Sequence, residues 1–389
     1  MLITNGKIYT MLDEEPLEGC SLRVEKGRIK EIGPQLKARK GEEVIDARGG
    51  WVLPGFIDAH THLGMMETAM GWEGLDLNEM SDPIVPDMRG IDGCNPMDSS
   101  FEEARSSGVT TVMTGPGSAG PLGGTWALIR TWGSVIDDMV LDPYVAMKTA
   151  FGENPKRAFG QRAGKEPMTR MATAALLRKG LTETRNYMAR KAKAAEKGEA
   201  FELNLKWEQL IPLMEKKVFL KAHAHRADDI LTSIRIAKEF DLRMTMDHCT
   251  EGHLVVDRLK KEPYAALVGP TLMPASKVEL KNKTFDTVVS LVHAGVKTAI
   301  VTDHPFVGIG LLGVSAGYAW KAGLSLMEAL RCITLFPAQI LGIEAGYGSL
   351  EPGKLANITI FDDNPLINIS RCLYTFGEGQ LIYRDASLG

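Results

Sequence analysis

Residues 55–62 are Gly55-Phe56-Ile57-Asp58-Ala59-His60-Thr61-His62, an apolar run that ends in two histidines one residue apart. Successive side chains of an extended strand point to opposite faces, so His60 and His62 point the same way and can hold one ion between them. The alternative is a surface strand with two solvated histidines. Residues 51–57 are nearly all apolar, which is typical of a strand buried on both faces. The spacing therefore predicts half of a metal site at the end of a buried strand.

The composition is that of a globular protein without a polyanionic partner. The 389 residues include 45 Lys and Arg against 49 Asp and Glu, and a formal net charge of -4 gives no field that would collect nucleic acid or an anionic membrane. The first nine residues lack the basic segment and apolar core of a signal peptide. Five scattered cysteines without a Cys-x-x-Cys pair predict neither disulfides nor a zinc knuckle. We expect a cytoplasmic protein with a small-molecule substrate, no nucleic acid and no membrane partner; a homo-oligomer is compatible with this composition.

Both ends of the chain have the pattern of short antiparallel strands. Short β-rich runs alternate with Gly turns up to residue 50, and the same pattern returns from residue 345 onward. Each terminal piece is too short to bury a core alone. We therefore expect a small β-sandwich domain composed of residues 1–50 and 345–389.

The middle of the chain, residues 51–344, alternates apolar β-branched runs with helical patterns, which is typical of parallel βα units. The expected strands cover residues 52–60, 109–113, 126–131, 144–150, 218–223, 242–248, 265–268 and 296–303. The expected helices cover residues 172–197, 228–240, 285–293 and 326–341. No Gly-x-Gly-x-x-Gly follows an early strand, so the fold class is α/β, with a (β/α)8 TIM-like barrel rather than an open dinucleotide-binding sheet.

Two loops of this middle part are candidates for the mouth of a site. The long stretch 63–100 has few periodic runs, and loops of this length inside compact domains tend to be functional. The glycine-rich stretch 115–124 lacks the ending of a P-loop, so we expect a tight loop that allows close approach of a substrate.

Further residues of metal-ligand type stand at the ends of the expected strands. His223 ends one strand, with His225 two residues further on; His248 ends another, and Asp303 ends the last. In a parallel barrel all strand C-termini open on one face, so residues far apart in sequence can converge there. One such histidine would more often be a packed or surface group. Several of them, each at the end of an apolar strand, predict a metal centre.

These residues make the chain resemble the amidohydrolase superfamily, and more closely its imidazolonepropionase-like and Xaa-Pro-dipeptidase-like branch. The matching features are the histidine pair after Pro54-Gly55-Phe56-Ile57-Asp58, the strand ends at His223 and His248, Thr302-Asp303, and the return through Pro352-Gly353-Lys354-Leu355-Ala356-Asn357. The resemblance implies one or two divalent ions per chain, Zn²⁺ or another transition metal, that activate a water. The implied ligands are His60, His62, Glu153, His223, His248 and Asp303.

Two ligand positions stay open at this point. The resemblance implies a bridging glutamate or carbamylated lysine, and residues 147–155 offer both. We favour Glu153 over Lys148, because a carboxylate is an oxygen ligand without modification. The strand pattern favours His223 over His225, which would then contact substrate or replace His223 if the strand ends later.

The resemblance also implies a mechanism. A bound divalent ion lowers the pKa of water from about 15.7 to about 7. Asp303 would accept the proton of this water and deliver it to the leaving nitrogen, and His225 or His304 would stabilise the developing charge.

The expected function is hydrolysis of a C-N bond in an amide or cyclic amide. Lys277 and Glu279, or Asn154, Lys156 and Arg157, could meet a carboxylate or polar ring, or could lie in surface loops. A metal-dependent deaminase of an aminated ring is the second hypothesis, although Arg226 stands three residues after His223, where an acid would favour it. A non-catalytic scaffold is the third, and the filled ligand positions argue against it.

Overall fold

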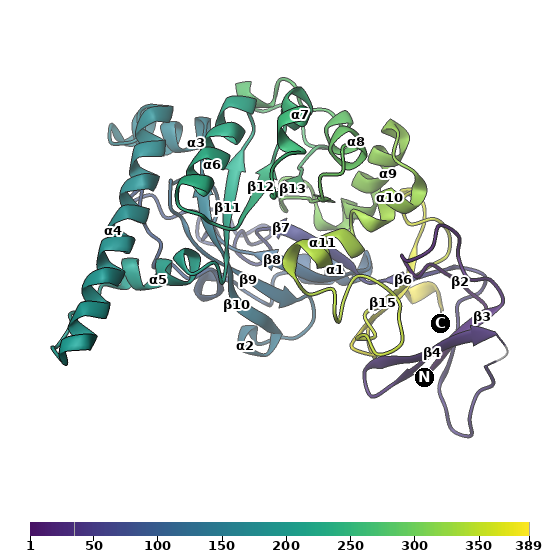
Figure 1. Ribbon diagram of the computed structural model, residues 1–389. Helices are drawn as coiled ribbons and strands as arrows, with labels where there is room; N and C mark the ends of the chain where they lie inside the picture. Colours follow the sequence, from purple (N-terminus) through teal and green to yellow (C-terminus); the bar gives the residue numbers. More distant parts are fainter. Residues whose placement is uncertain (35, 389) are drawn as a thin grey trace.

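A barrel-shaped sheet organises the computed structural model, which describes residues 1–34 and 36–388 (Figure 1). The eight neighbouring strands follow chain order: β7 (Phe56–Thr61), β8 (Val109–Thr114), β9 (Gly124–Arg130), β10 (Val140–Ala150), β11 (Phe219–Ala224), β12 (Met244–His248), β13 (Ala265–Val268) and β14 (Thr298–Ile300). The sheet nearly closes beyond β14, where the His62 amide donates to the His304 carbonyl at 2.8 Å. The expected α/β barrel of TIM-like form is confirmed.

Strand β9 departs from the all-parallel barrel that the sequence predicts. It pairs antiparallel with both β8 and β10. The link between β8 and β9, residues 115–123, holds no helix, and a parallel return needs a crossover of a dozen or more residues. The glycine-rich loop therefore folds back over the C-terminal end of β8, at the same face as the ends of the parallel strands.

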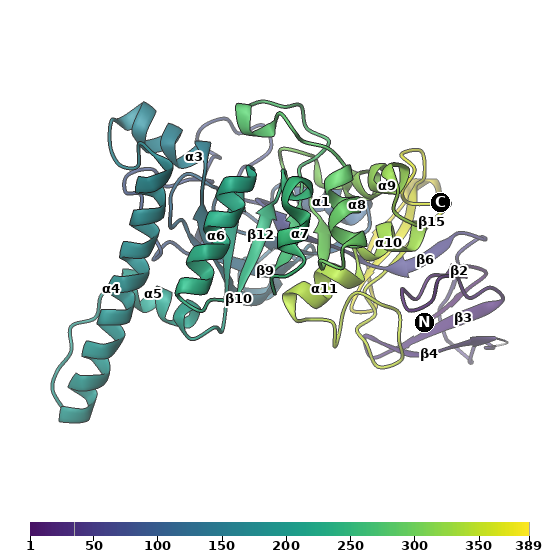
Figure 2. The same cartoon turned by 45° about the horizontal axis from the view of Figure 1, so that its top comes forward.

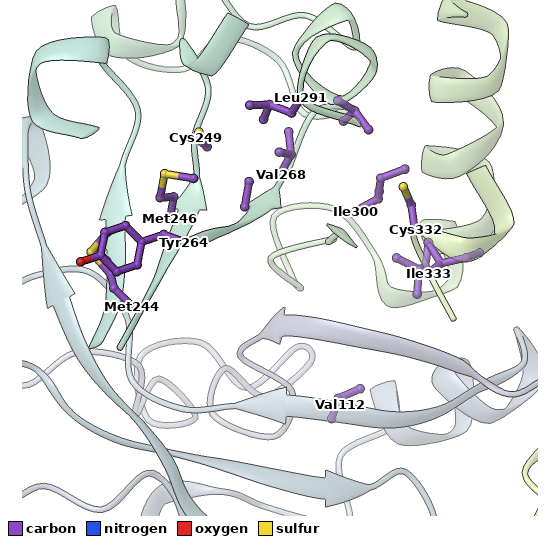
Figure 3. Close-up of a cluster of buried hydrophobic side chains, with 14 of the residues drawn as sticks. Val112, Met244, Met246, Cys249, Tyr264, Val268, Leu291, Ile300, Cys332 and Ile333 are labelled. Carbon is purple, nitrogen blue, oxygen red and sulfur yellow. The ribbon is translucent and has the colours of Figure 1, made fainter. Parts of the chain in front are cut away.

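Helices surround most of the barrel, and an apolar layer separates them from the strands. Figure 3 shows part of this layer, with Val268 of β13 beside Leu291 of α8. The helices are α1 (Ser100–Ser106), α2 (Ile136–Met139), α3 (Glu153–Pro155), α4 (Arg170–Lys197), α5 (Leu205–Met214), α6 (Ala227–Glu239), α7 (Val256–Leu259), α8 (Asp286–His293), α9 (Leu312–Ala322), α10 (Leu326–Arg331) and α11 (Leu335–Leu341). Among the described residues, no helix is both long enough and apolar enough to span a membrane.

Two of the expected helices show how local signals set their ends. Helix α4 begins after Thr169, whose side chain accepts the Ala172 amide, and ends at Gly198 with φ +66; it projects beyond the barrel in both ribbon views (Figures 1 and 2). The expected helix 326–341 is two helices, because the chain leaves helical geometry at Thr334 (φ -133, ψ -83).

Of the two smaller sheets, the four-stranded one takes all its strands from the N-terminal part of the chain. The five-stranded one combines strands from both ends of the chain, which lie on the same side of the molecule in Figure 2. The four-stranded sheet contains β4 (Arg28–Pro34), β3 (Cys20–Glu25), β1 (Leu2–Thr4) and β5 (Val44–Asp46). The five-stranded sheet contains β17 (Gln380–Arg384), β16 (Cys372–Gly377), β15 (Ile358–Phe361), β6 (Trp51–Pro54) and β2 (Lys7–Ile8). The division into domains at residues 50 and 345 stays a prediction.

Gly55 separates two strands where the sequence predicts one. β6 pairs with β15 and β2 in the five-stranded sheet, whereas β7 begins the barrel. A Cβ atom at Gly55 would lie 2.4 Å from the Thr110 side chain, so the chain can pass from one sheet to the other only with glycine here. The passage fixes β7, and with it both histidines of the opening stretch.

Candidate metal centre

Two groups of buried side chains meet at the C-terminal end of the barrel. His60, His62 and Asp303 form one group, and within it the possible ligand atoms all lie within 4.8 Å of one another; the same holds for His223, His225 and His248. The His60 and His248 ring centroids are 4.8 Å apart, so the two groups adjoin. The ends of β7, β11, β12 and β14 thus bring these residues together from across the chain.

Three of the histidines are oriented through Nδ1. The His60 Nδ1 lies 2.8 Å from Asp247 Oδ2, and the Nδ1 atoms of His62 and His248 lie 2.7 Å from the carbonyl oxygens of Gly115 and Gly269. A partner at Nδ1 fixes the tautomer and leaves Nε2 to face the site, as is usual for metal-binding histidines. On the other side, Nε2 of His60 and of His62 lie 3.2 and 3.1 Å from Asp303 Oδ1.

His223 and His225 are oriented differently from each other. The His225 Nδ1 lies 2.8 Å from the Thr250 hydroxyl, and its Nε2 lies 3.8 Å from Glu279 Oε1. His223 instead has Nε2 3.4 Å from Asn154 Nδ2, while its buried Nδ1 has no hydrogen-bond partner among the described residues. Both histidines of this pair therefore reach the centre.

The backbone is left-handed at two residues of the centre. φ is +67 at His248 and +53 at Asp303, a conformation that non-glycine residues adopt rarely. Strand alternation would send the side chains of Asp247 and His248 to opposite faces, yet both reach His60. The left-handed turn at His248 is what allows consecutive residues to serve the same site.

Burial sets the charge of these groups. Burial, together with the charges of Lys221 and Lys148, lowers the pKa of His60 well below its ordinary value, and burial lowers the pKa of His248 to about 4. Burial alone would raise the pKa of Asp303, but the neighbouring histidines His248, His60 and His62 outweigh it and hold the pKa well below its ordinary value. His60 and His248 are therefore neutral imidazoles and Asp303 is an ionised carboxylate, the forms that bind metals.

The two candidates for the bridging position lie in different surroundings. Lys148 is fully buried in β10, with Nζ 3.4 Å from His60 Nε2, and burial lowers its pKa to about 8. Glu153 lies beyond the strand, at the start of α3; its side chain is 27% exposed and its carboxylate lies 3.4 Å from Arg157. The structure thus brings Lys148 to the histidines and leaves Glu153 outside both groups.

His304 lies beside the centre without joining either group. Its Nδ1 accepts the Ile309 amide at 3.1 Å, and its Nε2 is buried without a hydrogen-bond partner among the described residues. Burial lowers the pKa of His304 to about 4. The side chain is neutral at pH 7 and cannot supply a fixed positive charge there.

Three supporting residues were not among the sequence predictions. Asp247 holds His60 and also lies 3.0 Å from Lys221 Nζ, whose ammonium donates to the Ala59 carbonyl at 2.9 Å. Asp58 accepts the Thr302 amide at 3.0 Å and hydroxyl at 2.6 Å, and the His60 amide at 3.1 Å. The available signal was a charged residue inside an apolar strand, which is rare unless the charge is paired.

A cavity of about 350 Å³ opens over the centre. Its walls include His62, His223, His225 and Asp303 from the two groups. The remaining walls come from segments 77–80, 117–119, 154–162 and 270–280, and from Phe306. Loop 63–100 is tied to the glycine-rich loop, since the Gly117 amide donates to the Leu77 carbonyl at 2.6 Å. Both loops expected at the mouth therefore lie there.

The model of the Amidohydrolase family matches residues 51–380. The chain belongs to this family. It is 36% identical to an amidohydrolase from Thermotoga maritima MSB8 of known structure, with a TM-score of 0.95 over 99% of this chain and 100% of that one. The imidazolonepropionase of Treponema denticola is 23% identical over 91% of this chain and 87% of its own length.

Other similarities are partial or concern the fold alone. Amidohydrolase tasK of Hapsidospora irregularis is 29% identical over 94% of this chain, which spans only 41% of that protein. A 5-methylcytosine deaminase from Klebsiella pneumoniae, 15% identical with a TM-score of 0.58, shares the fold. Membership of the Amidohydrolase family makes this chain a hydrolase of C-N bonds.

The side chains of the centre fit the divalent ions that the family generally uses. His223 Nδ1 and His248 Nε2 are buried without hydrogen-bond partners among the described residues. Buried polar atoms in native proteins are nearly always satisfied, and imidazole nitrogens with a carboxylate are ligands that Zn²⁺ accepts. An ion between these atoms would satisfy them.

Proposed function

We propose that this amidohydrolase is metal-dependent and cleaves an amide or cyclic amide of a small molecule by attack of water. The observation that carries the proposal is the adjoining pair of buried ligand groups at the barrel mouth. His60, His62 and Asp303 would hold one divalent ion, with zinc the first candidate. His223, His225 and His248 would hold a second. A bound ion supplies a Lewis acid for the carbonyl and lowers the pKa of water to about 7.

The residues around the ions have separate tasks in this proposal. Asp303, kept ionised by its neighbours, accepts the proton of the attacking water and passes it to the leaving nitrogen, so that an acid and an amine result. Asp247 and the Gly115 carbonyl hold the rings of His60 and His62 in place.

Lys148 rather than Glu153 is the proposed bridging residue. Support comes from the 3.4 Å contact of Lys148 Nζ with His60, and from Glu153, which belongs to neither ligand group and lies beside Arg157. Reaction of the Lys148 amine with carbon dioxide would supply the carboxylate that the bridge requires. The partial exposure of Glu153 would also make it a poorly fixed ligand.

The surroundings of Arg226 favour amide hydrolysis over deamination. Its guanidinium pairs with Asp228 at the start of α6, at 2.9 and 2.8 Å, and the side chain is 43% exposed. The position three residues after His223 thus holds an outward-facing cation instead of an acid that could protonate a ring.

A screen of dipeptides, N-acyl amino acids, cyclic ureides and aminopurines tests the reaction class. We expect the metal-loaded protein to hydrolyse at least one amide or cyclic amide, and the chelator-treated protein to hydrolyse none. Release of ammonia from aminopurines alone would replace the proposal with deamination. Full metal occupancy with no turnover of any compound would contradict it.

A further inference from the structure

The cavity over the metal centre has an unbalanced charge. Of the described residues that line it, only Asp303 carries a carboxylate, and that group already contacts two histidines. Three cations line the same cavity: Arg157, Arg162 and Lys277. Cationic walls attract anions and strengthen charge-assisted hydrogen bonds to them.

A short chain of contacts connects Lys277 to the metal centre. Its Nζ lies 2.7 Å from Glu279 Oε1 and 2.8 Å from Asn154 Oδ1, and the amide nitrogen of Asn154 lies 3.4 Å from His223 Nε2. A single amide group therefore separates the Lys277 ammonium from a histidine of the centre. The side chain of Lys277 is 13% exposed, so its ammonium is held in place.

Glu279 is the anchor of this arrangement. It is buried, and its second oxygen accepts the Glu153 amide at 2.9 Å. A Cβ atom at Gly152 (φ +81) would lie 2.6 Å from this oxygen, so the turn after β10 is shaped around the carboxylate. Glu279 thus fixes Lys277 while balancing its charge.

The excess positive charge comes from the segment after β10. Residues 156–161 form a π-helical turn, a feature found frequently at functional sites. It presents Arg157, whose link to Glu153 is long at 3.4 Å, and leads into Arg162, whose side chain makes no ion pair or hydrogen bond with the described residues. Apolar side chains complete the cavity: Leu77, Met80, Met273, Leu280 and Phe306.

We propose that Lys277, with Arg157 and Arg162 at the rim, binds a carboxylate adjacent to the scissile amide. The substrate would then be an N-acyl amino acid or a similar amide with a free carboxylate and an apolar side chain. This inference rests on the proposed function, because it uses the same cavity. It assigns specificity to residues that do not belong to the metal centre.

A matched pair of probes tests the inference on protein freed of metal, where no turnover interferes. N-acetyl-L-leucine carries the carboxylate, and N-acetyl-L-leucinamide is its neutral counterpart. Titration calorimetry should show that N-acetyl-L-leucine binds at least about tenfold more tightly than N-acetyl-L-leucinamide. The double variant Lys277→Gln/Glu279→Gln removes the inner ammonium without leaving a buried unpaired charge, and it should lower the preference for the carboxylate. Adding Arg157→Gln and Arg162→Gln also removes the excess positive charge, and this quadruple variant should bring the two affinities within about twofold.

The exposed neighbour Lys281 provides the control, because it does not line the cavity. Lys281→Gln should keep the wild-type preference for the carboxylate. Equal affinities in the wild type, binding of neither probe, an unchanged preference in the double variant, or a preference that survives in the quadruple variant would overturn the inference. Equal hydrolysis of both probes by the metal-loaded enzyme would refute the inference but leave the proposed function standing. A preference for the carboxylate without hydrolysis of any amide would support the inference but contradict the proposed function.

Discussion

The carboxylate of Asp247 lies 2.8 Å from the Nδ1 of His60, and both side chains are fully buried. Because the same carboxylate lies 3.0 Å from Lys221 Nζ, it connects a proposed metal ligand to the interior of the barrel. In Asp247→Asn a neutral amide replaces the carboxylate, so it would accept a weaker hydrogen bond from the His60 Nδ1–H. We expect a loss of about 10- to 100-fold in zinc affinity, measured by competition with a chromogenic chelator.

Asp257→Asn is the control for this substitution, since Asp257 is exposed and pairs with Lys260 away from the centre. An unchanged zinc affinity in Asp247→Asn, with native circular dichroism, would show that the contact with His60 does not support metal binding.

Asp303→Asn separates proton transfer from metal binding. The side chain keeps its size but loses the basic oxygen, so turnover should fall by at least about a hundredfold. The bound metal should remain largely in place, because the histidines are unchanged; plasma emission spectrometry of the purified variant checks this. Retained activity would eliminate Asp303 as the proton acceptor.

Lys148→Met and Glu153→Gln decide which residue bridges the ions. Lys148 is buried against His60, whereas Glu153 is partly exposed beside Arg157. We expect the metal-to-protein ratio and the hydrolysis rate to fall in Lys148→Met and to change little in Glu153→Gln. The opposite pattern would restore Glu153 as the bridging ligand.

The small four-stranded sheet offers a stability prediction. The Arg23 guanidinium donates to Glu42 at 2.8 Å, and this hydrogen bond, with that from the Arg39 amide, lowers the pKa of Glu42 to about 2. Because the pKa is depressed in the folded state, the contact stabilises the fold above the unfolded pKa of about 4.5, and this stabilisation is lost as the pH falls towards about 2.

Urea unfolding of Glu42→Gln should therefore show a lower midpoint than the wild type at pH 7, and the difference should shrink between pH 4.5 and pH 2. Glu43→Gln, at an exposed position, is the control and should shift the midpoint little at either pH. If the midpoints of wild type and Glu42→Gln differ by the same amount at pH 7 and at pH 2, the assigned pKa is contradicted.

The sequence predicted the barrel strands well because apolar β-branched runs and strand-ending ligands are local signals. It could not predict the reversal of β9, since only the absence of a helix between β8 and β9 distinguishes an antiparallel return. The sequence also predicted one strand where the structure has β6 and β7. The chain divides at Gly55 because the Thr110 side chain lies close to it, a contact that the local sequence does not show.

The site was predictable to the same extent. His60, His62, His248 and Asp303 were identified from strand ends, and the structure brings them together. The role of Asp247 was not predicted, because its contacts depend on the register of β11 against β12 and on the left-handed turn at His248. Glu153 was preferred as the bridging residue because of its carboxylate alone. Whether Glu153 or Lys148 lies beside His60 depends on where β10 ends, which the sequence does not show.

The measurement that tests the central claim most directly is the zinc content of the protein after dialysis against zinc and removal of unbound metal. The wild type should retain at least one ion per chain, and His62→Ala together with His248→Ala, one substitution in each ligand group, should abolish stoichiometric retention. A wild-type protein that folds normally and retains no stoichiometric metal would contradict the assignment of the barrel mouth as a metal centre.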